Sequence, residues 1–175
     1  MSDCAVATQS FCSQDFLSPE NVLRADETVT EVFSMMFGFH IQAIDPAGPG
    51  CPAEIGARTA VVGFSGALRG SCQIRMTSLA ARAVASAMLG GMPVEDDDSL
   101  DDTLGELCNM LAGGWKNGIS SLSSEVALSP PTVISGGDYK VHVHKPSDTI
   151  ARTYRFDGHT LQLVLCREDG GEPKR

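Results

Sequence analysis

The chain has 175 residues, 42% of them hydrophobic, which is enough for one well-buried core but not for two, so we expect a single domain. Its formal net charge of -9 makes nucleic acid and anionic membrane surfaces poor partners. No apolar run approaches the roughly 20 residues of a membrane span, and the first residues lack the basic and apolar regions of a signal peptide, so we expect a cytoplasmic protein.

The first long helix is predicted to begin at Ser18. Residues 1–17 are polar and aperiodic, and we expect them to form a flexible segment. Ser18-Pro19-Glu20 then supplies an N-cap hydroxyl, a proline at the first helical position and an acid near the positive end of the helix dipole. Apolar residues recur at helical spacing as far as a stop at Gly38. These residues are Val22, Ala25, Val29, Val32, Phe33, Met36 and Phe37.

Strands and a second helix follow. The segments IQAID (41–45) and RTAVVGF (58–64) are rich in β-branched residues and predict strands, with the loop PAGPGCP (46–52) between them. The turn SGALRG (65–70) predicts a hairpin with GSCQIRM (70–76). Thr77-Ser78 is typical of a helix start, and Gly90-Gly91 of a helix end.

The second half of the chain predicts one more helix and three more strands. The acid-rich run EDDDSLDD (95–102) leads into the helix, and we expect Asp98 or Ser99 to cap it and the rest of the run to be a solvated loop. After the break SPPT (129–132), the predicted strands are YKVHVHK (139–145), IARTYRF (150–156) and TLQLVLC (160–166), with a hairpin at Asp157-Gly158.

This order of elements predicts an α+β domain. We expect three main helices packed on one face of a mixed, largely antiparallel sheet. The domain would span residues 18–168, and residues 169–175 would form a flexible tail.

The third helix has one apolar and one polar face. At about 100° per residue, with Leu104 at zero, Glu106 points at about 200°, Asn109 at about 140° and Gly113 at about 180°. Asp102 and Asn117 flank them on this outer face. Gly113 costs about 1 kcal/mol of helix propensity relative to alanine, and it leaves room for a partner's backbone to approach. The opposite, core-facing stripe consists of Leu100, Leu104, Leu107, Cys108, Leu111 and Trp115.

Several short motifs, taken in order, resemble the CheX branch of the CheC/CheX/FliY chemotaxis phosphatases. They are GFSGALRGSCQIRM, LAARAVASAMLGG, LGELCNMLAGG and LSPPTV, and the resemblance covers roughly residues 20–167. It implies an α+β fold whose active-site helix is exposed beside the sheet. It also implies hydrolysis of the aspartyl-phosphate of a CheY-like receiver domain. On this resemblance Glu106 and Asn109 match the two functional positions of the family.

The resemblance also defines what the partner supplies. A phosphorylated receiver carries its own phosphoaspartate, Mg²⁺ and lysine, so this chain is expected to need no cofactor of its own. Asn109 would hold the attacking water and Glu106 would pair with the receiver lysine, while Asp102, Gly113 and Asn117 would contact the partner. Relatives of the CheX type pair through sheet edges, so we expect a homodimer, with a terminal strand such as TLQLVLC able to offer the edge.

The first helix has no second ExxN motif, because Thr30 follows Glu27 and Ser34 follows Glu31 at that spacing. This chain is therefore expected to have one site.

Two other functional hypotheses remain open. The same fold could be a non-catalytic receiver-binding or adaptor module. Alternatively, the chain could be a metal or small-ligand sensor. The candidate ligands for that role are His142, His144, His159, Asp96, Asp97, Asp98 and the six cysteines. We expect the histidines to be solvated strand residues and the cysteines to be reduced, because no CxxC pair and no spaced acid completes a metal site.

Overall fold

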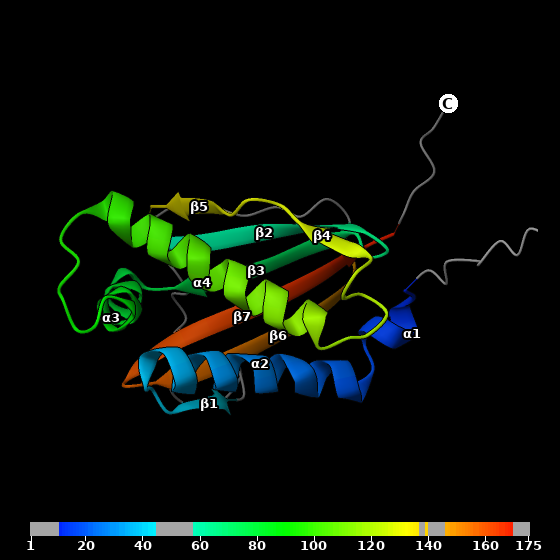
Figure 1. Cartoon of the computed structure of the whole chain (residues 1–175), viewed down its shortest axis with the longest axis horizontal. Coiled ribbons are helices and arrows are strands. Elements are labelled where there is room, and N and C mark those ends of the chain that lie inside the picture. The colour runs from blue at the N-terminus through cyan, green and yellow to red at the C-terminus, as the bar shows by residue number, and fades with distance from the viewer. Residues whose placement is uncertain (1–10, 45–57, 137–138, 140–145, 170–175) are drawn as a thin grey trace, which may run out of the picture.

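The computed structural model describes residues 11–44, 58–136, 139 and 146–169, and its long helices lie together on one face of an antiparallel sheet (Figure 1). The helices are α1 (Ser13–Phe16), α2 (Pro19–Phe37), α3 (Ser78–Met88) and α4 (Asp97–Asn117). The strands are β1 (Ile41–Ile44), β2 (Arg58–Gly66), β3 (Gly70–Met76), β4 (Val126–Leu128), β5 (Thr132–Ser135), β6 (Pro146–Phe156) and β7 (His159–Glu168). Within these ranges no helix has the length and hydropathy that crossing a bilayer requires.

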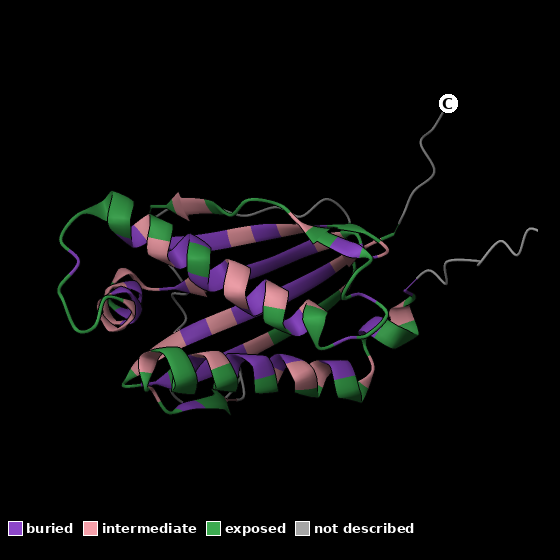
Figure 2. Ribbon diagram, viewed as in Figure 1, coloured by how far each residue is buried: buried purple, intermediate pink, exposed green. Residues whose placement is uncertain are grey.

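The sheet confirms the predicted fold class. Its order is β1-β6-β7-β3-β2-β4, β5 also pairs with β2, and every pairing between the described strands is antiparallel. Buried residues are concentrated in the central strands of the sheet and along the sides of the helices that face it (Figure 2). The prediction that TLQLVLC offers a free edge is wrong, because β7 is hydrogen-bonded to β6 on one side and to β3 on the other.

The two predicted hairpins are confirmed. β2 and β3 pair directly across the SGALRG turn. In the β6–β7 hairpin, Phe156 lies opposite His159, and both Asp157 (φ 42°) and Gly158 (φ 76°) have the positive φ that a two-residue turn of this kind needs. Residues 140–145 of the predicted strand YKVHVHK lie outside the described residues. β4 and β5, which the sequence did not predict, pair with β2 instead.

Residues 11–17 belong to the folded domain, so the prediction of a flexible segment up to residue 17 is wrong for this part. Phe16 in α1 is fully buried, and its ring meets Trp115 edge-on at 5.8 Å between centroids. Asn21 Nδ2 donates a hydrogen bond to the Asp15 carbonyl at 2.6 Å. Two buried aromatic side chains, Phe16 and Phe11, thus anchor a short and otherwise largely polar segment. Residues 1–10 and 170–175 lie outside the described residues.

Helix ends follow local capping chemistry. Ser18 caps α2 by accepting a hydrogen bond from the Asn21 N–H, and Gly38 ends it with φ 68°, both as predicted. Met36, one of the apolar residues at helical spacing, is 56% exposed. The N-cap of α4 is Asp96, two residues before the first predicted cap. Asp96 Oδ1 accepts from the Ser99 N–H at 2.7 Å, and this bond lowers the pKa of Asp96.

Candidate functional site

The apolar face of α4 seats the helix on the sheet. All six residues of the predicted core stripe are buried. Trp115 Nε1 donates to the Asn21 carbonyl at 3.1 Å, which ties α4 to α2. Cys108 Sγ contacts the carbonyl oxygens of Ala60 at 3.5 Å and Cys72 at 3.6 Å. Because this stripe is anchored, the opposite face of the same helix has a defined direction outward.

Glu106 and Asn109 lie on that outward face, as predicted. Glu106 is exposed and Asn109 is half-buried, one helical turn apart. Among the described residues, neither side chain has a hydrogen-bond or ion-pair partner. A carboxylate and a carboxamide therefore stand side by side with their polar groups available to a second molecule.

Glycines on both flanks let neighbouring elements approach α4 closely. A Cβ on Gly105 would lie 3.1 Å from Pro131 Cγ, on the connection between β4 and β5. A Cβ on Gly114 would lie 2.7 Å from Thr28 Cγ2 of α2. The segment that carries Glu106 and Asn109 is thus held between two close contacts. Gly114 lets α2 and α4 pack closely. It does not terminate α4, because this helix continues to Asn117.

Gly113 has a different environment from Gly114. Its added Cβ would meet only Leu128 Cδ1, at an ordinary van der Waals distance of 3.8 Å. Asp102 and Asn117 are exposed on the same side of the helix. The outer face therefore presents polar side chains around a position without side-chain bulk, and contact of these residues with a partner stays a prediction.

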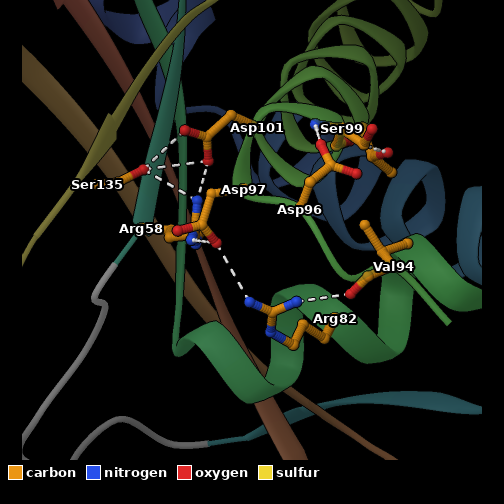
Figure 3. A network of polar contacts seen from close by, with 9 residues as sticks. Arg58, Arg82, Val94, Asp96, Asp97, Ser99, Asp101 and Ser135 are labelled. Carbon is orange, nitrogen blue, oxygen red and sulfur yellow. Dashed lines mark hydrogen bonds and ion pairs between the residues drawn. The ribbon is translucent and has the colours of Figure 1, made fainter.

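The acids at the start of α4 have more than one role, which the sequence reading missed. Asp97 and Asp101 bind the guanidinium of Arg58, at the start of β2 (Figure 3). Asp98 and Asp102 are exposed. The prediction of a solvated loop is therefore wrong for Asp97 and Asp101 in two respects: both lie inside α4, and both pair with Arg58, although the Asp97 side chain is still 68% exposed. The sequence held a signal for this contact, because Asp97 and Asp101 are four residues apart and therefore share the side of the helix that faces the core.

The metal-sensor hypothesis gains no support within the described ranges. There, no group of three histidine, cysteine or acidic residues could hold a metal ion. The described cysteines are free thiols, and hydrogen bonding with Cys108 together with burial raises the pKa of Cys72 well above its ordinary value. His142, His144, Cys4 and Cys51 lie outside the described residues. The described cysteines are Cys12, Cys72, Cys108 and Cys166.

The chain is similar in sequence to known chemotaxis phosphatases. Residues 58–154 match the family model described as chemotaxis phosphatase CheX. The chain is 40% identical over 82 residues to the CheY-P phosphatase CheX of Thermotoga maritima, an alignment that covers 46% of this chain and 53% of that protein. The alignment thus spans about half the length of this curated relative.

Solved structures share the fold. A CheX crystal structure from Desulfovibrio desulfuricans is 26% identical with a TM-score of 0.71, covering 85% of this chain and 99% of that one. The CheX chain of a CheX-CheY-BeF3-Mg²⁺ complex from Borrelia burgdorferi is 19% identical with a TM-score of 0.65, covering 86% of this chain and 97% of that one. At this identity the second likeness shows the fold alone.

Proposed function

Because the chain belongs to the CheX family of chemotaxis phosphatases, we propose that it hydrolyses the aspartyl-phosphate of a CheY-like receiver domain. The observation that carries this proposal is the joint outward projection of Glu106 and Asn109 from a helix held on both flanks. The name of the Thermotoga maritima relative, a CheY-P phosphatase, and the CheY component of the Borrelia burgdorferi complex support this class of partner.

In this proposal Asn109 positions the attacking water. Its carboxamide has a carbonyl that accepts a hydrogen bond from water and N–H groups that donate, so it can hold a water in line with the phosphorus without changing its own charge. A hundredfold to thousandfold acceleration needs only about 3 to 4 kcal/mol, which positioning of a nucleophile can supply.

Glu106 has a different role, since it carries a carboxylate and lies one helical turn from Asn109. It would pair with the receiver lysine and set how deeply the Asn109 side chain enters the partner's site. Asp102, Gly113 and Asn117 would complete the contact surface along the same helix face. Mg²⁺ would be held by the receiver, as part of the substrate.

The proposal extends to assembly and location. A homodimer would form through sheet edges, and the edges available between described strands are β1 on one side and β4 with β5 on the other. A receiver substrate would place the protein in the cytoplasm.

The test is phosphate release from a receiver charged with acetyl phosphate and then freed of excess donor. Catalytic amounts of the wild-type protein should accelerate release at least about tenfold, and the double variant Glu106→Ala/Asn109→Ala should not. Binding of the phosphorylated receiver should be measured in parallel by fluorescence anisotropy. Wild-type binding without acceleration would overturn the hydrolytic proposal and favour the adaptor alternative.

A further inference from the structure

Arg58 joins the start of β2 to the start of α4 through a network of charged contacts (Figure 3). Its side chain is only 6% exposed. Nη2 lies 2.6 Å from Asp97 Oδ1, and Nη1 binds both Asp101 Oδ1 and, at 3.1 Å, Ser135 Oγ of β5. Ser135 Oγ in turn donates to Asp101 Oδ2 at 2.9 Å. One guanidinium, projecting from β2, thus bonds the first two turns of α4 and Ser135 of β5.

A second arginine extends the network to α3. Arg82 Nη2 lies 3.2 Å from the same Asp97 oxygen that Arg58 binds, and Arg82 Nη1 donates to the Val94 carbonyl at 2.6 Å. Val94 lies in the connection between α3 and α4. The start of α4 is therefore tied to β2, to β5 through Ser135 and to α3.

The arrangement adds, at the start of α4, a polar constraint on rotation about the helix axis to the one that the core stripe supplies. Asp97 and Asp101 are one turn apart on a single stripe, and the planar guanidinium bonds one acid through each terminal nitrogen. Measured as for Glu106 and Asn109, these acids point at about 20° and 60°, so the outward pair lies on the other side of the helix. A helix that could rotate at its start would carry Glu106 and Asn109 out of place.

We propose that Arg58 is a positioning residue for the phosphatase site, an inference that rests on the proposed function. Without its positive charge, Asp97 and Asp101 would lose the group that draws them to the sheet. Asp97 and Asp101, two like charges one helical turn apart, would then repel each other. Because a displacement of about 1 Å can lower a rate about 100-fold, a loosened α4 would lose catalysis while its core stripe kept it folded.

The chain offers a matched control in Arg152 of β6. Its Nε and Nη2 bind Asp26 of α2 at 2.9 and 2.6 Å, so it ties a helix to the sheet with the same chemistry, but the helix is α2. Arg58→Met and Arg152→Met both remove a guanidinium that spans a helix and a strand. Both should lower the denaturation midpoint, but only Arg58→Met should loosen α4.

The experiment measures phosphate release under multiple-turnover conditions. The value of kcat is calculated per folded molecule, with the folded fraction determined by circular dichroism. Hydrogen exchange of the amides of residues 104–113 is followed by NMR in the same variants. We expect kcat to fall about 10- to 100-fold in Arg58→Met and to stay within about twofold of wild type in Arg152→Met. Hydrogen exchange of residues 104–113 should become faster in Arg58→Met and not in Arg152→Met. Arg58→Lys should have a denaturation midpoint close to that of wild type but a kcat that is still lowered, because an ammonium keeps the charge and lacks the planar fork that binds both acids.

The outcomes separate this inference from the proposed function. If wild type accelerates release and Arg58→Met keeps its kcat per folded molecule, or if both arginine variants lose it equally, the positioning role is wrong. If wild type does not accelerate release, the proposed function fails. Equal exchange of residues 104–113 in Arg58→Met and Arg152→Met would also overturn the claim that Arg58 restrains the rotation of α4. Should Arg58→Met not fold, Asp101→Asn, which keeps the shape of the side chain, is expected to lower kcat in the same direction.

Discussion

The neighbouring glycines of α4 allow the packing of this helix to be tested by two matched substitutions. Gly113→Ala and Gly114→Ala bring the same gain in helix propensity, about 1 kcal/mol each. The added methyl group would fit at Gly113 without a clash, because the nearest atom is Leu128 Cδ1 at an ordinary van der Waals distance of 3.8 Å. At Gly114 it would lie 2.7 Å from Thr28 Cγ2, so either the side chain or the helix must shift.

The expected free energies of unfolding follow from these distances. Gly113→Ala should stabilise the protein by about 1 kcal/mol. In Gly114→Ala an overpacking penalty of about 1 to 3 kcal/mol opposes the same gain, so the variant should range from unchanged to about 2 kcal/mol less stable. Urea denaturation followed by circular dichroism measures both values. Equal stabilisation by the two substitutions would refute the close packing of α4 on α2.

The same pair connects packing to function. Gly113→Ala adds bulk to the outward face between Asn109 and Asn117, so the more stable variant should bind the receiver several-fold more weakly and show a higher KM. An unchanged KM would remove Gly113 from the docking face. Gly114→Ala, whose methyl group points toward α2, should affect stability more than KM.

Two further predictions concern the ion pair at Asp148 and the accessibility of the cysteines. A hydrogen bond from Ser13 and the ion pair with Arg167 lower the pKa of Asp148, so its contribution to stability is complete above about pH 4 and is lost as the pH falls through the lowered pKa. Asp148→Asn should therefore lower the free energy of unfolding by about 1 to 2 kcal/mol at pH 7 and by much less near pH 2. An equal loss at both pH values would contradict this reasoning. Peptide mapping after brief alkylation should find exposed Cys12 modified and buried Cys72 protected until unfolding, and rapid modification of Cys72 would contradict the packing beneath α4.

Local signals in the sequence were sufficient for much of the fold. The Ser18 cap, the Asp157-Gly158 turn and the core stripe of α4 each depend on residues within a few positions of one another, and all three are confirmed. The outward direction of Glu106 and Asn109 followed from the same periodicity.

Features that depend on distant contacts were missed. β4 and β5 are short, are separated by two prolines, and exist because β2 pairs with them across the fold. α1 and the residues just before it are held by two buried rings, Phe11 and Phe16, in an otherwise largely polar segment. Arg58 reaches acids 39 and 43 residues away in sequence, so no local pattern linked it to α4.

The role of Asn109 is tested most directly by single-turnover dephosphorylation at saturating concentrations of this protein. With Asn109→Ala, the account predicts a rate constant at least about 100-fold below that of wild type, with the dissociation constant for the phosphorylated receiver changed by less than about threefold. Glu106→Ala should instead weaken binding, because it removes the charge that pairs with the receiver lysine. A wild-type rate constant for Asn109→Ala at saturation would contradict the claim that this carboxamide positions the attacking water.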